Sequence, residues 1–327
     1  MKEMSDGCEI DQVLLVREAE LRKRRDGAEY LRLSLGDRTG SVAAVVWDGV
    51  AECAPQARAG FVVRVAGRFT LHQRFGAQIT VRTLAAAEPG TFSLEDLLDG
   101  PPHSVAQMEA ELRELLDTVR DPYLRALLDR VFGPTSQLWP RFRDAPAAKH
   151  FHQAYRHGLL EHALSVGQAA HLLCVGPFAE VDHDLAVTGA LMHDIGKLDA
   201  YTADPGAIDL TGHGRLQGEI PLGYYRVRRL CEEIEGFPPH LAEQVGHIIL
   251  SHHGALEHGS PVVPCTREAT LVHFLDNLGG RLGSFDRLEK ELPEGAAWSP
   301  YDRAIGSGAY FAARAVAAEA QGDRAAA

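Results

Sequence analysis

The period of the hydrophobic pattern changes near residue 90, and this change restricts the chain to a β-rich region followed by a helical one. Before residue 90, β-forming residues alternate or cluster in segments that turn sequences such as DG, DRTG and FGA separate: EYLRLSLGD (29–37), SVAAVVWD (41–48), GFVVRVAGRFTL (60–71) and AQITVRTL (77–84). With a first strand expected at 12–21, the region holds five short strands. The sequence therefore predicts an all-β, five-stranded small barrel over residues 1–90.

Apolar residues recur with helical spacing after residue 91. A short helix capped by Ser93 and the helix breaker Gly100-Pro101-Pro102 predict a linker over 91–103. Ser104 then caps a helix that continues to Arg120, and further helices are expected at 122–132, 145–175, 184–197, 220–234, 239–252 and 266–282. We therefore expect an all-α bundle over 104–315 and an Ala-rich tail at 316–327.

Composition narrows the class of protein. The 327 residues suffice for two domains, and no stretch approaches the roughly 18 uncharged apolar residues of a membrane helix. The start, MKEMSDGCEIDQ, lacks the apolar core of a secretory signal, which predicts a cytoplasmic protein with no membrane partner. Five scattered cysteines without a CxxC pair argue against disulfides and against a thiolate zinc site. A metal in this chain must therefore be held by nitrogen and oxygen ligands.

The net charge of −12 is unevenly distributed. Residues 1–90 carry 13 Lys/Arg against 12 Asp/Glu, and the rest of the chain carries 20 against 33. The turn positions of the barrel fit a five-stranded OB fold, whose loops often bind oligonucleotides. The residues expected to contact phosphates or bases are Arg22, Lys23, Arg24, Arg25, Trp47, Arg64, Arg68, Phe69, Arg74 and Phe75. The alternative is a solvated basic turn with aromatic residues in the core.

Histidines gather in the helical region. Of the 16 in the chain, only His72 and His103 precede residue 150. Five places along the region put an imidazole or a carboxylate at or near the end of an apolar helical stretch: 160–162, 193–197, 218–220, 251–254 and 273–277. Side chains on facing helices of a bundle can build one metal site in the core.

The pair His193-Asp194 is the most informative of these places. Adjacent residues of a helix point about 100° apart, so both reach one site only if it lies between them, as a metal or a carboxylate-bridged metal pair does. Lys197 follows Asp194 by three residues and is expected on the same face, where its cation suits an anionic phosphate. His162, His252 and Asp276 supply further nitrogen and oxygen ligands in a fixed order along the chain.

The order His, His-Asp, His, Asp resembles the HD superfamily of metal-dependent phosphohydrolases, in which a helical bundle holds one or two divalent metals. The resemblance extends to YhaM-type 3′-to-5′ exoribonucleases of bacteria over most of residues 10–310. It is carried by DRTGSVAAVVWD in the barrel and by AYRHGLLEHALSV (154–166), ALMHDIGK (190–197), ILSHHGALEHGSPVVP (249–264) and EATLVHFLDNL (268–278). The resemblance implies an HD-type helical bundle behind an OB-like barrel.

The resemblance also implies the ligand roles. It assigns the first metal to His162, His193, Asp194 and Asp276. Asp194 would bridge to a second ion completed by His252, with or without His253. The implied catalytic residues are Asp194, Lys197 and His253.

Three positions depart from the pattern that the resemblance implies. Where the two-metal branch has a histidine in a GHI-like stretch, this chain has Glu219. As a ligand, Glu219 would shift the preference toward Mn²⁺ or Mg²⁺; alternatively the second site is lost, or His213 replaces it. His157 stands in place of an expected glycine, and Gly279 in place of an expected acidic residue.

The expected function is therefore that of a metal-dependent 3′-to-5′ exonuclease. It would hydrolyse single-stranded RNA, with DNA as an alternative, to nucleoside 5′-monophosphates. The expected cofactor is one or two divalent ions, Mn²⁺ first, with Mg²⁺, Co²⁺ and Fe as alternatives. A phosphohydrolase of small or cyclic nucleotides and a single-stranded nucleic-acid binding module with a degenerate metal site are the alternative functions; a diiron oxygenase ranks last. The sequence leaves the oligomeric state open, a homo-oligomer included.

Overall fold

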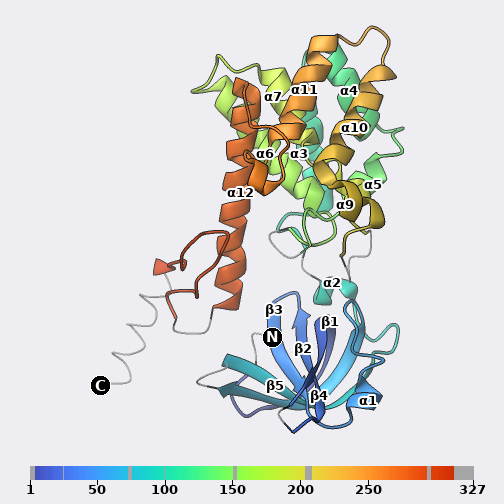
Figure 1. The fold of residues 1–327 in the computed structure, drawn as a ribbon, viewed down its shortest axis with the longest axis vertical. Coiled ribbons are helices and arrows are strands. Elements are labelled where there is room, and N and C mark those ends of the chain that lie inside the picture. The colour runs from blue at the N-terminus through green and yellow to red at the C-terminus, as the bar shows by residue number, and fades with distance from the viewer. Residues whose placement is uncertain are drawn as a thin grey trace. The chain divides into compact units, whose positions relative to one another are not determined.

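The computed structural model describes residues 4–24, 26–72, 76–98, 100–149, 153–202, 208–292 and 296–312. Within these ranges the chain divides into two compact units, one of residues up to Gly100 and one of residues from Pro101 onward. The first is a β-barrel and the second a helical bundle (Figure 1). The predicted combination of a β-barrel and an all-α region is confirmed. No helix among the described residues is both long enough and apolar enough to cross a membrane.

Five strands close the barrel in the order β1-β2-β3-β5-β4. They are β1 (Glu9–Lys23), β2 (Glu29–Asp37), β3 (Gly40–Val46), β4 (Val62–His72) and β5 (Gly76–Ala86). The strand β1 pairs with β4 through its first half and with β2 through its second half, and β3 pairs with β5 in parallel. A bulge between Val16 and Glu18 bends β1 where it changes partner. This order, with one long strand shared by both sides of the barrel, is the topology of an OB fold.

The barrel core follows the period-two pattern of the sequence. Leu31, Leu33 and Leu35 of β2 are all buried, and the residues between Leu31 and Leu35 face outward or lie half-buried. Phe69 of β4 is also buried in this core. The prediction that Phe69 contacts bases was therefore wrong, because its ring fills the barrel interior.

The helical elements have the following bounds. They are α1 (Val50–Cys53) and α2 (Leu94–Leu97) in the first unit, and α3 (Val105–Leu116), α4 (Pro122–Phe132), α5 (Trp139–Asp144), α6 (Gly158–Val175), α7 (His183–Met192), α8 (Lys197–Ala200), α9 (Gly212–Gln217), α10 (Glu219–Glu232), α11 (Pro239–Ser251), the 3₁₀ turn η1 (Leu256–His258) and α12 (Arg267–Glu291) in the second.

Two of the predicted helices have different bounds in the structure. The helix expected over 145–175 begins only at Gly158, because His157 adopts a left-handed conformation with φ of 72° and the described residues of 145–157 form turns and loops. The helix expected over 184–197 ends at Met192, and residues 193–196 form turns before α8. Asp194 and Lys197 therefore do not share one continuous helix. The tail at 316–327 lies outside the described residues.

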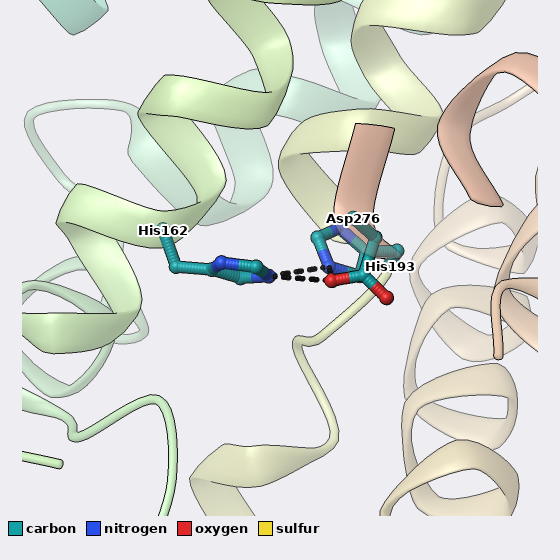
Figure 2. Close-up of side chains that lie close together, drawn as sticks. All are labelled: His162, His193 and Asp276. Carbon is teal, nitrogen blue, oxygen red and sulfur yellow. Dashed lines mark hydrogen bonds and ion pairs between the residues drawn. The ribbon is translucent and has the colours of Figure 1, made fainter. Parts of the chain in front are cut away.

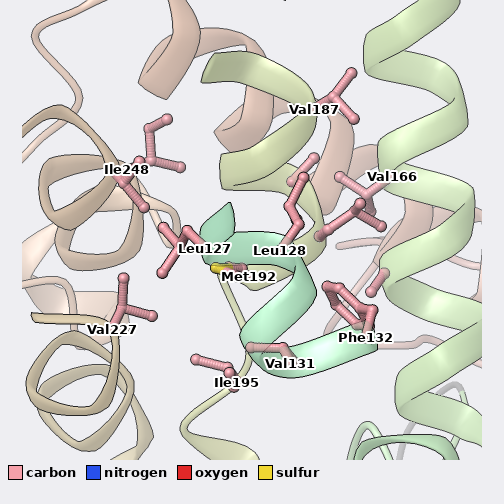
Figure 3. Packing of buried hydrophobic residues seen from close by; sticks show 14 of the residues in the cluster. Leu127, Leu128, Val131, Phe132, Val166, Val187, Met192, Ile195, Val227 and Ile248 are labelled. Carbon is pink, nitrogen blue, oxygen red and sulfur yellow. The ribbon is translucent and has the colours of Figure 1, made fainter. Parts of the chain in front are cut away.

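Helix α7 lies at the centre of the bundle. All of its residues from Leu185 to Met192 are buried, as expected for a helix that is apolar on every face. It packs against α6, α11, α12 and α4. Figure 3 shows this core, in which Leu127, Leu128 and Phe132 of α4 meet Val187 and Met192 of α7. The end of α7 therefore delivers the residues that follow it, His193 and Asp194, into the bundle interior.

Candidate metal centre

Four segments bring the predicted ligands to one place. His193 and Asp194 follow the end of α7, His162 lies in the second turn of α6, His252 follows α11, and Asp276 lies within α12. The three histidines and Asp194 are each at most 3% exposed. Figure 2 shows His162, His193 and Asp276 pointing toward one another from three helical segments. Residues far apart in sequence therefore converge on one buried cluster.

The distances within the cluster match those between ligands of one ion. His162 Nε2 lies 3.0 Å from His193 Nε2, 3.1 Å from Asp276 Oδ1 and 3.3 Å from Asp194 Oδ2. His193 Nε2 lies 3.3 Å from the same Asp194 oxygen. Ligands at right angles around an ion with bonds of about 2.1 Å stand about 3.0 Å apart. His162, His193 and Asp276 therefore form a group that could hold one divalent ion, and Asp194 Oδ2, which is paired with Lys197, lies beside them.

Backbone carbonyls fix which ring nitrogens face the cluster. His193 Nδ1 donates to Ala190 O and His252 Nδ1 donates to Ile249 O, each at 2.7 Å. Because a carbonyl oxygen only accepts, Nδ1 carries the proton in each ring and Nε2 presents a lone pair in the neutral form. Such an outer hydrogen bond orients a histidine ligand toward a metal.

Two facing pairs of side-chain atoms lie beside this cluster. His252 Nε2 faces Asp194 Oδ1 at 3.6 Å, and both atoms are buried without a hydrogen-bond partner among the described residues. His253 Nε2 faces Glu219 Oε1, also at 3.6 Å, while His253 Nδ1 donates to His258 O. Each pair sets one acceptor against another, which is unfavourable unless a cation or a proton lies between them. The rings of His252 and His253 are 4.4 Å apart, so the two pairs are neighbours.

The charges of the cluster shift the pKa values of its members. Burial opposes the charged form of His162, yet hydrogen bonds to Asp194 and Asp276 raise its pKa to about 9. Against the cost of burial, Lys197 and His193 hold the pKa of Asp194 well below its usual range, and His162 does the same for Asp276. The carboxylates are therefore ionised, as metal ligands must be.

Lys197 is the cation of the site. Its Nζ lies 2.7 Å from Asp194 Oδ2, although α8 begins only at Lys197. Burial opposes its charge, but Asp194 and Glu219 raise its pKa above the ordinary value. The side chain is 12% exposed, so the ammonium group of Lys197 lies at the partly accessible edge of the cluster.

Exposure increases toward one side of the site. The side chains of His162, His193 and Asp194 are at most 3% exposed, whereas those of Glu219, Asp276 and His253 are 18%, 19% and 30% exposed. Glu219, Asp276 and His253 are therefore the members of the site that are most accessible to solvent.

Several residues that sequence reasoning missed hold this arrangement together. Tyr201 donates a hydrogen bond to Glu219, and burial and this carboxylate raise the pKa of Tyr201 to about 12. The amide of His253 donates to the buried Ser260 Oγ at 3.0 Å. Ser260 belongs to the motif SHHGALEHGSP. The end of this motif therefore folds back on His253, near its start.

Two glycines allow the segments to approach closely. A Cβ atom on Gly196 would lie 1.9 Å from Glu219 O, so the start of α10 packs directly on the HDIGK backbone. Gly254 has φ of 81°, and a Cβ there would lie 2.1 Å from the ring of His273. The ring of His273 in turn donates from Nδ1 to His252 O.

The remaining predicted ligand alternatives lie in the same unit. His213 is in α9, and within the described ranges it belongs, like Asp194 and Glu219, to neither group of side chains that could hold a metal; those groups are His162, His193, Asp276 and His252, His253, Asp276. His157 occupies the left-handed position that glycine favours, and its Nδ1 lies 2.8 Å from Arg143 O. Nothing lies within 4 Å of a Cβ built on Gly279.

The predicted nucleic-acid surface is partly described. Arg22 pairs with Glu20 at 2.8 Å and Lys23 lies 3.9 Å from Glu29, so these two cations are partly neutralised. Arg24 lies 4.8 Å over the ring of Trp47, which stacks on Tyr30 at 5.0 Å. The sequence did not predict a role for Tyr30, which lies in β2 and stacks on Trp47. Arg25, Arg74 and Phe75, which were also predicted to contact nucleic acid, lie outside the described residues.

Comparison with known proteins agrees with this geometry. A family model described as HD domain matches residues 159–280. The chain is 29% identical over 290 residues to the 3′-5′ exoribonuclease YhaM of Geobacillus sp. (strain WCH70), covering 88% of this chain and 87% of that protein. It is 27% identical to the 3′-5′ exoribonuclease YhaM of Bacillus subtilis (strain 168), covering 88% and 90%.

One solved structure also resembles the chain. The second OB-fold domain of replication protein A from Methanococcus maripaludis matches with 22% identity and a TM-score of 0.23, covering 28% of this chain and 96% of that domain. The OB assignment made above rests on strand order and not on this match. The HD match covers α6 to α12, which carry the ligand cluster, and an HD domain implies dependence on a divalent metal. The helical region therefore contains an HD domain, and the chain, which is similar over most of its length to exoribonucleases, is an enzyme of the hydrolase class.

Proposed function

We propose that the protein is a metal-dependent 3′-to-5′ exonuclease that hydrolyses single-stranded RNA to nucleoside 5′-monophosphates, with single-stranded DNA as a second substrate. The observation that carries this proposal is the pair of acceptor contacts, Asp194 with His252 and Glu219 with His253, beside the four-ligand cluster. Two cation positions side by side suit the in-line displacement at a phosphodiester. The similarity to YhaM exoribonucleases supports RNA as the substrate.

We assign the first cation to His162, His193, Asp194 and Asp276, and the second to His252, His253, Glu219 and the free oxygen of Asp194. The mixed carboxylate and imidazole set of the second position suits Mn²⁺ or Mg²⁺ better than softer metals. When bound, such ions lower the pKa of a coordinated water and stabilise charge on phosphoryl oxygens.

The chain's own residues supply the rest of the chemistry. Lys197, partly exposed and fully charged, neutralises an oxygen of the phosphate that is cleaved. Burial and the neighbouring His252 lower the pKa of His253, and its Nδ1 proton is engaged by His258 O. The Nε2 atom of His253 is therefore an acceptor, which suits a ligand or a base for the attacking water. The Asp194 carboxylate holds Lys197 in place.

The test is incubation of purified protein with single-stranded RNA labelled at its 5′ end, in the presence of Mn²⁺, Mg²⁺ or Co²⁺. We expect a ladder that shortens from the 3′ end and releases nucleoside 5′-monophosphates. A 3′-phosphate on the RNA tests the direction of cleavage, and Asp194→Ala controls for contaminating nucleases. Unchanged RNA with every metal contradicts the proposal.

The same assay separates the alternative functions. Hydrolysis of mononucleotides or cyclic dinucleotides but not of RNA indicates a small-nucleotide phosphohydrolase. Tight binding of RNA without turnover and without bound metal indicates a binding module with a degenerate site.

A further inference from the structure

Two carboxylates at one end of the helical bundle each hold two cations. Asp199 of α8 pairs with Arg141 of α5 at 3.1 Å and with Arg226 of α10. Asp209 pairs with Lys149 at 2.8 Å and with Arg215 of α9 at 3.2 Å. We call Arg141, Lys149, Arg215 and Arg226, with the two aspartates, the basic cluster.

The basic cluster carries an excess of two positive charges. In the described part of the helical unit, every other ion-paired group of Lys and Arg has at least as many carboxylates as cations; Arg143 and Arg156, for example, share Asp144 and Glu109. The chain after residue 90 holds 20 Lys/Arg against 33 Asp/Glu. The average composition of this acidic region would predict a local excess of negative charge, and the basic cluster has the opposite.

Most of the cluster's cations remain accessible. The side chains of Arg215, Arg141 and Lys149 are 63%, 50% and 36% exposed, whereas Arg226 is 18% exposed. Arg226 is therefore the largely buried partner of Asp199, and the three other side chains are accessible to solvent. An arginine fork and a lysine ammonium both bind phosphate oxygens.

The basic cluster borders the segment that carries Lys197. Asp199 lies in the same short helix, α8, and Arg141 Nη2 also donates to Leu198 O at 2.8 Å. Helix α8 packs against α9 and α10, and α10 begins with Glu219 of the metal centre. Thr211 Oγ1 donates to Asp199 O, and Thr202 donates its amide to Asp209 O, so the two aspartates are tied to one substructure. Figure 1 shows α5 and α9 near the same end of the bundle.

We propose that the basic cluster binds the phosphodiester backbone of the substrate a few nucleotides upstream of the bond that is cleaved. This inference rests on the proposed function and deepens it, because it assigns contacts with the upstream strand to residues of the helical unit. A mononucleotide at the metal centre has no upstream phosphate for the cluster to bind. The cluster therefore favours oligonucleotides over small phosphate esters through contacts on the helical unit itself.

The opposing interpretation is a purely structural ion-pair network that joins α5, α8, α9 and α10. Such a network would affect thermal stability without affecting the choice of substrate. Lys149 and Arg215 are the best residues to change. Arg141 also donates to a backbone carbonyl, and Arg226 is largely buried, so changing either of these would disturb the fold.

The experiment compares Lys149→Gln/Arg215→Gln with the control Arg130→Gln/Arg267→Gln. Both double variants of the full chain change the net charge equally, and the control residues lie on α4 and at the start of α12. We expect the ratio of kcat/KM for single-stranded RNA to kcat/KM for bis(p-nitrophenyl) phosphate to fall about tenfold or more in the first variant only. Loss of two phosphate contacts should also reduce the slope of log affinity against log salt by about 1.4.

Affinity is measured separately, by fluorescence anisotropy of a labelled single-stranded RNA in the Asp194→Ala background. An unchanged salt slope and an unchanged substrate ratio, both equal to the control's, overturn the proposal. If the parent protein hydrolyses bis(p-nitrophenyl) phosphate but not RNA, the proposed function fails, and the anisotropy measurement still decides whether the basic cluster binds the strand. Melting temperatures of both variants identify any purely structural effect.

Discussion

His252 Nε2 and Asp194 Oδ1 face each other at 3.6 Å, both buried and neither with a hydrogen-bond partner in the described part of the chain. This contact is unfavourable unless a proton or a cation lies between the two atoms. Although burial opposes it, hydrogen bonding to Asp194 raises the pKa of His252, so a metal replaces that proton and adds to stability when it binds. We expect chelation by EDTA to lower the melting temperature and Mn²⁺ to restore it. At a free metal concentration 100 times Kd, the gain is about 2.7 kcal/mol. Calorimetry with metal analysis checks this; a melting temperature that EDTA leaves unchanged contradicts it.

Asp194→Asn tests whether this carboxylate joins the two cation positions. The side chain keeps its shape but loses its charge, its pairing with Lys197 and its affinity for a metal. We expect bound metal to fall to near zero, as measured by mass spectrometry of the dialysed protein. The matched control is Asp286→Asn, which changes an exposed carboxylate of α12 and should keep the metal content of the parent. Equal metal content in both variants would rule out the assigned role.

Glu219 provides a test of metal preference. Replacing it with histidine exchanges a hard oxygen ligand for an imidazole, so we expect affinity to shift from Mn²⁺ toward Co²⁺ and Zn²⁺. Glu219→Ala should remove the second equivalent of metal and leave the first, because the four ligands of the first position are untouched. Isothermal titration with each metal measures both effects. Two equivalents of Mn²⁺ in Glu219→Ala would show that Glu219 is not a ligand.

Gly196 and Gly279 are predicted to respond in opposite ways to alanine. A Cβ on Gly196 would lie 1.9 Å from the main-chain oxygen of Glu219, which cannot move without displacing α10. We expect Gly196→Ala to destabilise the fold by about 3 kcal/mol or more, in line with severe overpacking. Gly279 has open space around it within α12, so Gly279→Ala should stabilise the protein by about 0.5–1 kcal/mol. Urea denaturation measures both.

The stack of Trp47 on Tyr30 predicts a base-binding surface on the barrel. Trp47 is 38% exposed, and Arg24 lies over its ring. We expect Trp47→Ala to weaken binding of single-stranded RNA by about 1–3 kcal/mol, the value typical of one stacked base. Phe61→Ala serves as the control, since Phe61 is an exposed aromatic residue of the same unit that is not among the predicted contacts. Anisotropy titrations in which both variants bind like the parent would remove the barrel from substrate binding.

Periodicity was sufficient to predict the architecture. The strands at 29–37 and the helix at 122–132 were predicted with the bounds that the structure shows, because alternation and capping residues mark them plainly. The helix over 145–157 was wrong, since the left-handed conformation of His157 is set by tertiary contacts with Arg143 and Asp144. Single residues in unusual backbone conformations leave little trace in hydrophobic patterning.

Some residues of the candidate site could likewise be predicted from the sequence, and others could not. The spacing of His162, His193-Asp194, His252 and Asp276 was readable in advance, and the structure brings these residues together. Tyr201 and Tyr30 were not readable, because each matters only through a neighbour, Glu219 or Trp47, that folding places beside it. Phe69 was misassigned because a strand pattern alone does not say which face of a barrel strand is enclosed.

The main chain of Glu219 rests on Gly196, so the spacing between the HDIGK turn and α10 is set without help from the Glu219 side chain. Mutation can consequently exchange the donor group at this position while the surrounding architecture persists. Position 219 is therefore where a carboxylate could be replaced by an imidazole at the least structural cost.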